Sequence, residues 1–185
     1  EKFYWIGVTQ FGQGKVCAGR MVGPVSQADD LLPAFRHWSI EAEIGEIITA
    51  GSATADYLAG EGIVRAWVVG EPGLRREVEM AGVLPAGEED CEAVVLGWDD
   101  SATLLTIRKA ALAVRRGARF VSTNVDRTYP SPEGPIMSVG ALAEAIRIGP
   151  GKDPGIAGKP FEPTFRDPPS TVDPPPSRVA LIGHT

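Results

Sequence analysis

From Glu46 onward, the sequence alternates short apolar runs with stretches in which apolar residues recur every three or four positions. Apolar runs of this length are typical of buried strands, and the longer spacing is typical of helices that pack on a sheet. The segments between them are short and often contain glycine or proline. This alternation predicts an α/β fold with a mostly parallel sheet, in which ligands bind at the carboxyl ends of the strands.

The expected strands share short apolar runs and span residues 3–8, 46–49, 64–70, 93–97, 119–124, 156–158 and 178–183. The expected helices span residues 31–38, about 52–59, 74–80, 103–116 and 139–148. Ser52 or Thr54 is expected to cap the second of these helices, and Gly117 to end the fourth. Nine of the sixteen prolines lie between Pro150 and Pro176, so this region is not expected to be helical.

Composition excludes several classes of function. Acidic residues outnumber basic ones by 24 to 18, and a net charge of −6 gives no electrostatic support for nucleic-acid binding. The apolar stretches are far shorter than the roughly 20 residues that cross a bilayer. No basic segment followed by an apolar core opens the sequence, so a signal peptide is not expected. Cys17 and Cys91 match no metal-ligand spacing, which favours free thiols in a reducing compartment. We therefore expect a cytoplasmic protein with no nucleic-acid or membrane partner.

The polar loop after the strand at 119–124 contains Asn124 and Asp126. These side chains could present an amide and a carboxylate to one ligand, or they could form an Asx turn as the chain leaves the strand. Lys159 follows the strand end at 156–158, where its ammonium group could neutralise a phosphate or simply be solvated.

Two further groups of residues have more than one interpretation. Asp99 and Asp100 follow another expected strand, and they could bind a hard cation or cap the next helix. The pair Gly12 and Gly14 lacks the third glycine of a dinucleotide fingerprint, so an unrelated nucleotide-binding domain has little support. No nucleophile elbow or zinc-protease motif accompanies the histidines, and a triad hydrolase is not expected.

The order of several segments resembles the haloacid-dehalogenase-like (HAD) phosphatases of the para-nitrophenyl-phosphatase type, subfamily IIA. The similarity extends over about residues 40–166 and is most specific in the pair T-N-x-D, at residues 123–126, and G-K-P, at 158–160. The segments that carry it are EIITAGSATADYL (46–58), WVVGEPGL (67–74), AVVLGWD (93–99), GARFVSTNVD (117–126), GAL (140–142) and GKP (158–160).

The resemblance implies a Rossmann-like core with an inserted α/β cap that closes over the substrate. Residues 1–67 would be a core segment, of which 1–39 do not match the family. Residues 68–150 would be the cap, and the Pro-rich residues 151–185 would return to a core that is incomplete in this chain. A homodimer formed through the cap is one expected assembly.

The resemblance also implies roles for individual residues. Family members use an aspartate nucleophile, a second aspartate two positions later, a Thr or Ser, a Lys and Mg²⁺. Lys159 matches the family lysine, and Thr9 is the candidate for the phosphate-binding hydroxyl. Asn124 and Asp126 would contact the substrate, which would be a small phosphorylated metabolite.

The sequence departs from the family where the chemistry is carried. No two aspartates are spaced two apart, so the nucleophile motif is absent, and His184 stands where a metal-binding aspartate is expected. Mg²⁺ is therefore implied by the family, while this chain provides no ligands for it. Two functions remain open at this point: a HAD-like phosphatase that is incomplete or inactive as given, and a catalytically dead pseudophosphatase that binds a small molecule or a protein.

Overall fold

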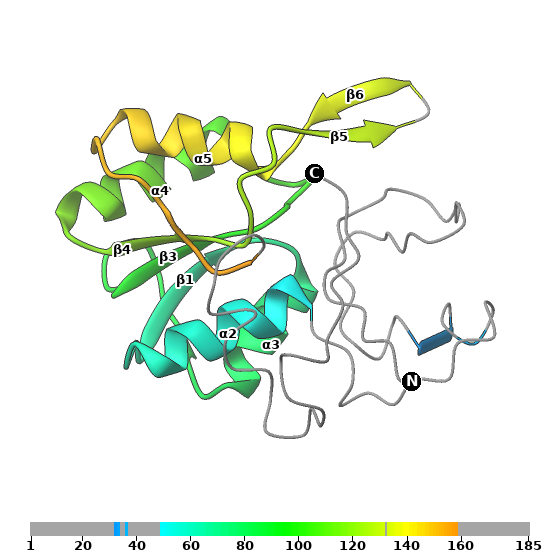
Figure 1. The fold of residues 1–185 in the computed structure, drawn as a ribbon. Coiled ribbons are helices and arrows are strands. Elements are labelled where there is room, and N and C mark those ends of the chain that lie inside the picture. Colours follow the sequence, from blue (N-terminus) through cyan, green and yellow to red (C-terminus); the bar gives the residue numbers. More distant parts are fainter. Residues whose placement is uncertain (1–31, 34–35, 37–48, 132, 159–185) are drawn as a thin grey trace, which may run out of the picture.

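The computed structural model describes residues 32–33, 36, 49–131 and 133–158. Three layers make up most of this part: a five-stranded parallel sheet with two helices on each face (Figure 1). The strands lie in the order β2-β1-β3-β4-β7 and are β1 (Arg65–Val69), β2 (Leu84–Pro85), β3 (Ala93–Leu96), β4 (Arg119–Ser122) and β7 (Gly155–Ile156). The helices are α2 (Ala50–Gly60), α3 (Pro72–Met80), α4 (Leu104–Arg116) and α5 (Val139–Ile148). The predicted α/β class with a parallel sheet is confirmed.

The register of the sheet explains why its central strands are so apolar. Val94 pairs with Trp67 on one side and with Phe120 on the other, so β3 is hydrogen-bonded along both edges. All four residues of β3 are buried, because helices cover both faces of the sheet. The chain alternates between the two faces: Val94 and Leu96 pack with α4 and α5, and Ala93 and Val95 pack with α2 and α3.

Helix boundaries agree closely with the predicted ones except at the starts of α2 and α3, each of which begins two residues earlier than expected. The N-cap of α2 is Thr49, whose side chain accepts a hydrogen bond from the Ser52 backbone while the Ser52 hydroxyl accepts one from the Thr49 backbone. The prediction that Ser52 or Thr54 caps this helix is wrong, because the reciprocal Thr49–Ser52 pair satisfies the first turn. Thr49 therefore does not extend a strand, and residues 46–48 lie outside the described part.

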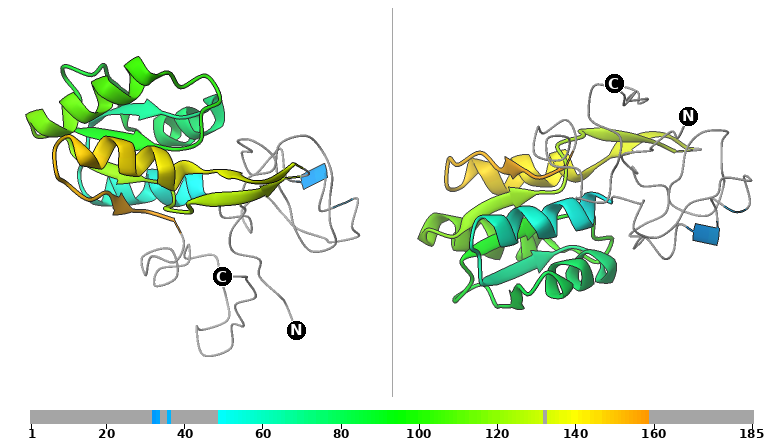
Figure 2. Two further views of the ribbon diagram at one scale, coloured as in Figure 1. Left: turned by 90° about the horizontal axis from the view of Figure 1, so that it is seen from above. Right: turned by 60° about the horizontal axis from the view of Figure 1, so that its bottom comes forward.

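A two-stranded hairpin was not predicted. Strands β5 (Thr128–Ser131) and β6 (Gly134–Met137) pair antiparallel, and they extend away from the layered body (Figures 1 and 2). The segment was expected to be a polar loop, and prolines are uncommon within strands. A separate hairpin accommodates them, since it has no central strand. Of the helix expected over 31–38, Leu32, Pro33 and Arg36 are described and are helical. The strands expected at 3–8 and 178–183 lie outside the described residues.

No helix in the described part of the chain is long and apolar enough to cross a membrane.

Candidate functional site

The carboxyl end of β4 leads into the polar loop that contains Asn124 and Asp126. Buried Ser122 donates a hydrogen bond from its hydroxyl to the Asn124 carbonyl oxygen, at 2.6 Å. The Asp126 backbone N–H donates to Asn124 Oδ1 at 3.1 Å, which closes an Asx turn. Of the two interpretations offered for this pair, the turn is therefore present in the structure. Asn124 is half-buried and Asp126 is exposed, so the turn leaves the Asp126 carboxylate accessible.

The same loop is held in place by the start of α5. The Gly140 backbone N–H donates to the Asp126 carbonyl oxygen at 2.9 Å. A Cβ atom at Gly140 would lie 2.4 Å from the Val125 carbonyl oxygen, a distance that real Cβ atoms do not adopt. Only glycine allows α5 to approach the loop this closely, and the approach fixes the position of the loop relative to the sheet.

The segment that leads to Lys159 runs alongside the end of β4. The Ala157 backbone N–H donates to the Ser122 carbonyl oxygen at 3.0 Å, and a Cβ atom at Gly158 would lie only 2.0 Å from the Thr123 carbonyl oxygen. The structure thus brings the first residue of G-K-P against the first residue of T-N-x-D. Lys159 and Thr9 themselves lie outside the described residues, and their expected roles stay predictions.

A shallow cleft lies beside this loop. Its volume is about 560 Å³, and it is lined by Val125 and Arg127 from the loop, by α5 and by the segment that enters β7. Arg147 donates two hydrogen bonds to the Glu144 carboxylate, at 2.7 and 2.6 Å. These bonds lower the pKa of Glu144 and raise that of Arg147. The charges of this pair compensate each other, so the pair adds little net charge to the cleft.

The topology of the sheet predicts a second possible ligand site, at the ends of β1 and β3. Helices α3 and α4 follow the adjacent strands β1 and β3 and lie on opposite faces, which is where doubly wound sheets open a ligand crevice. Here the side chain of Leu74 fills that space: a Cβ atom would lie 2.7 Å from Leu74 Cδ2 at Gly70 and 2.5 Å at Gly97. The two glycines after the strands make room for a leucine, and the crevice is closed.

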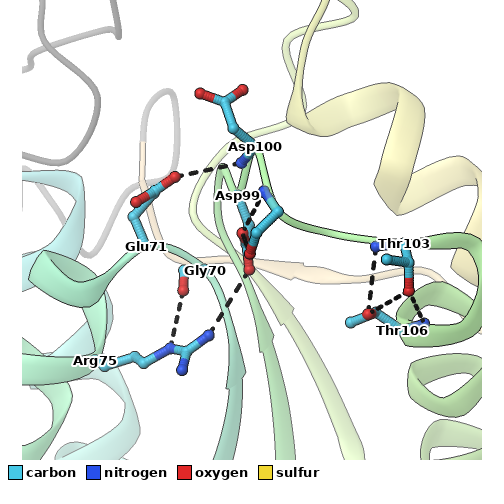
Figure 3. A network of polar contacts seen from close by, with 8 residues as sticks. Gly70, Glu71, Arg75, Asp99, Asp100, Thr103 and Thr106 are labelled. Atoms are coloured by element: carbon cyan, nitrogen blue, oxygen red, sulfur yellow. Dashed lines mark hydrogen bonds and ion pairs between the residues drawn. The ribbon is translucent and has the colours of Figure 1, made fainter.

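A polar network joins the ends of β1 and β3 (Figure 3). Arg75 donates to the Gly70 carbonyl oxygen at 2.9 Å, and its guanidinium lies 3.7 Å from the Asp99 carboxylate, whose side chain is only 7% exposed. Asp99 also accepts a hydrogen bond from the Ser101 backbone at 2.9 Å. Asp99 is therefore occupied by structural partners.

The Asp99–Asp100 pair does not cap helix α4. Helix α4 is capped by Thr103, whose hydroxyl accepts from the Thr106 backbone at 3.2 Å, so the prediction that the aspartates cap this helix is wrong (Figure 3). A reciprocal Thr103–Thr106 pair satisfies the first turn, and Asp99 closes a tighter turn before it. Within the described residues, no group of three or more His, Cys, Asp or Glu side chains could hold a metal ion.

Comparison with known proteins identifies the family. The chain is 32% identical over 140 residues to the acid sugar phosphatase of Staphylococcus haemolyticus. The aligned region covers 75% of this chain and 53% of that protein. The structure matches the p-nitrophenyl phosphatase from Archaeoglobus fulgidus with a TM-score of 0.73 and 31% identity, over 78% of this chain and 56% of that one. A glycerol phosphate phosphatase from Mycobacterium tuberculosis, in complex with magnesium, matches with a TM-score of 0.72 and 30% identity, over 78% and 45% of the two chains.

The chain belongs to the HAD-like phosphatase family, in its p-nitrophenyl phosphatase branch. No family model matches it. The chain spans about half the length of the curated relatives that it matches.

Membership of the HAD-like family implies Mg²⁺, and the described residues do not fit it. A hard cation needs several oxygen ligands at one point, and the described carboxylates are not grouped in this way. The carboxylate of Asp99 is engaged by Arg75 and Ser101.

Sequence reasoning missed the residues that shape this edge of the sheet. Gly158 and Gly140 set the position of the loop, and Leu74 closes the crevice beside it. The available signal was a glycine immediately after an apolar run, at positions 70, 97 and 158, which indicates close approach of another segment.

Proposed function

We propose that this HAD-like chain serves the hydrolysis of phosphate monoesters of small metabolites, and that its described part is the cap that contacts the substrate. The relatives are named acid sugar phosphatase, p-nitrophenyl phosphatase and glycerol phosphate phosphatase. The observation that carries the proposal is the contact between Gly158 and Thr123, because it joins the two most specific motifs of the resemblance at one edge of the sheet.

Each candidate residue then has a stated role. The ammonium group of Lys159 would neutralise a phosphoryl oxygen as a point charge, and the hydroxyl of Thr9 would donate to another. The exposed carboxylate of Asp126 would accept hydrogen bonds from hydroxyls of the leaving group. The Asn124 amide nitrogen, which makes no hydrogen bond within the described residues, would donate to the same group.

The cap that we propose covers residues 49–158, which is more than the 68–150 suggested by sequence. A boundary at residue 68 would cut β1, and a boundary at 150 would remove β7 from its pairing with β4. The two ends of the larger unit also meet, because a Cβ atom at Gly158 would lie 3.7 Å from Ala50 Cβ. Adjacent ends are the geometry that insertion of one domain into another requires.

By itself, this chain should bind substrate without turning it over. A covalent aspartyl-phosphate requires a carboxylate that attacks phosphorus and a second acid that protonates the leaving oxygen, and the sequence contains no D-x-D. The test is hydrolysis of p-nitrophenyl phosphate with and without Mg²⁺ by the chain, by Lys159→Ala and by Lys152→Ala as a surface-lysine control. We expect no Mg²⁺-dependent turnover by any of them. Turnover that only Lys159→Ala abolishes would reveal a nucleophile elsewhere in this chain.

Binding is tested separately, by calorimetric titration with glucose 6-phosphate, glucose and inorganic phosphate. The proposal expects the sugar phosphate to bind most tightly and Lys159→Ala to weaken it about tenfold, since a charge-assisted contact is lost. Asp126→Ala should weaken sugar phosphate binding and leave inorganic phosphate binding unchanged. Equal affinity for glucose and glucose 6-phosphate would contradict a phosphate-ester site.

The second candidate, a pseudophosphatase that acts as a binding module, is favoured by the missing D-x-D. Both candidates expect binding without turnover by this chain, and the gene sequence on either side of it separates them. An in-frame acidic motif beyond residue 185 or before residue 1 favours the phosphatase. A stop codon directly after Thr185, together with confirmation of the first residues, favours the binding module.

A further inference from the structure

The outward face of α4 has an unusual composition. Its exposed residues are three leucines and three arginines: Leu104, Leu105, Leu112, Arg108, Arg115 and Arg116. We call these six residues the α4 face. Leu104, Leu105 and Leu112 are 77%, 56% and 47% exposed. The helix contains no acidic residue, although the chain as a whole is acidic. Solvated helix faces normally mix both signs of charge and few large apolar side chains, so this composition makes the face a candidate for contact.

The spacing on this face indicates the shape of what it contacts. Leu105 and Leu112 are one heptad apart, and so are Arg108 and Arg115. Residues that repeat every seven positions form a straight seam on a helix, against which a second helix can pack along its length. Leucine and arginine alternate along the seam in the order 105, 108, 112 and 115.

The charges on the seam are available to a partner. Lys109 pairs with the Glu88 carboxylate at 2.9 Å, and Arg116 donates to the Glu88 carbonyl oxygen. Arg108 and Arg115, by contrast, make no hydrogen bond or ion pair within the part of the chain that the structure describes. These two guanidinium groups flank exposed leucines, so a partner that presents carboxylates at matching positions would complement them.

We propose that the α4 face docks an acidic amphipathic helix of a partner protein. That helix would carry apolar residues at the heptad position that faces Leu105 and Leu112, and Asp or Glu at the position that faces Arg108 and Arg115. A second copy of α4 does not satisfy this seam, because that helix has no acidic residue to pair with Arg108 and Arg115. A lipid surface does not satisfy it either. Arg108 lies between Leu105 and Leu112 in the seam, so inserting the leucines into the acyl layer would draw a charge in with them.

The test uses a fluorescein-labelled synthetic peptide of three heptads with Leu and Glu at the two seam positions, measured by fluorescence anisotropy on the full chain. We expect saturable binding that weakens with added salt. The double variant Arg108→Glu/Arg115→Glu should weaken it at least about tenfold, and a peptide with Lys in place of Glu should restore binding to this variant. Leu105→Ser/Leu112→Ser should weaken binding of both peptides.

Controls on the opposite side of the molecule separate the face from general charge effects. Arg76→Glu and Met80→Ser alter exposed residues of α3 and should leave peptide binding unchanged. Circular dichroism establishes that each variant is folded. The proposal is overturned if the acidic peptide does not saturate, or if charge reversal on α4 does not alter its affinity. Self-association that is lost in Leu105→Ser/Leu112→Ser would assign the face to a second copy, and cosedimentation with phosphatidylglycerol vesicles would assign it to a membrane; either result overturns the proposal.

Discussion

At Gly158, a single methyl group would occupy the space that the Thr123 carbonyl oxygen already fills, at 2.0 Å. Gly158→Ala must therefore push β7 away from the end of β4, and we expect a loss of about 2 kcal/mol in the free energy of unfolding. Urea denaturation followed by circular dichroism measures this loss. Because Ala157 and Gly158 lead to Lys159, the same variant should also weaken glucose 6-phosphate binding.

Gly60 provides a matched control for that variant. It ends α2, and a Cβ atom there would meet nothing within 4 Å. Gly60→Ala should leave stability unchanged or raise it by up to about 1 kcal/mol, since alanine favours the helix more than glycine does. Equal destabilisation by both variants would show that the approach of Gly158 to Thr123 is not tight.

Cys91 is the described residue whose protonation responds most clearly to burial. Burial raises the pKa of its thiol, and the neighbouring Asp90 charge acts in the same direction. The thiolate is the reactive form, so in a Cys17→Ser variant we expect Cys91 to react with a disulfide reagent more slowly in the native chain than in urea. Equal rates in the two states would contradict this expectation.

The same shift affects stability at high pH. A thiol whose pKa is raised by folding stays protonated longer in the native state than in the unfolded chain. Its contribution to stability is therefore complete at neutral pH and is lost as the pH rises through and beyond the usual thiol range. Cys91→Ser should flatten this part of the dependence of unfolding free energy on pH.

The structure places Thr103 at the N-cap of α4, whereas the sequence suggested Asp99 or Asp100. A pair of variants distinguishes the two possibilities. Thr103→Ala removes the hydroxyl that accepts from the Thr106 backbone, and it should cost about 1 kcal/mol. Asp100→Ala should cost far less, because the structure gives the Asp100 side chain no part in the cap; only its backbone N–H bonds, to Glu71. Thermal unfolding of both variants gives the comparison. A larger loss for Asp100→Ala would favour capping by the aspartates.

The extent of a strongly periodic helix was predictable, and the residue that caps its start was not. Helix α4 was expected at 103–116 and runs from Leu104 to Arg116, since its apolar spacing and Gly117 mark both ends. The start of α2 was misplaced because Thr49, Ser52 and Thr54 are all acceptable caps by residue type. Only the distances show that Thr49 and Ser52 bond reciprocally.

The hairpin shows a different limit of sequence reasoning. Its strands are four residues each and contain prolines, so no alternation of apolar and polar residues distinguishes them from a loop. Only part of the candidate site could be predicted from the sequence. Asn124 and Asp126 follow a recognisable strand, whereas the contact of Gly158 with Thr123 joins residues far apart in sequence and depends on the order of strands in the sheet.

For the whole molecule, the meeting of Ala50 and Gly158 predicts that residues 49–158 fold independently of the rest of the chain. Both apolar clusters of the described part are formed by residues within this range, and so are all the described strands of the parallel sheet. A fragment of residues 49–158 should unfold cooperatively, with a midpoint within a few degrees of the corresponding transition of the full chain. Thermal unfolding followed by circular dichroism gives the midpoint, and the dispersion of amide resonances by NMR shows whether the fragment is folded.

A fragment of residues 68–150 is the matched comparison. It lacks α2, which contributes buried Ala55 and Leu58, and it loses part of β1 and all of β7. Removing two fully buried side chains with their helix costs several kcal/mol, comparable with the total stability of a small domain. We therefore expect the shorter fragment to be unfolded. A cooperative transition in 68–150 would return the cap boundaries to those suggested by sequence, and an unfolded 49–158 would mean that the cap depends on the remainder of the chain for its stability.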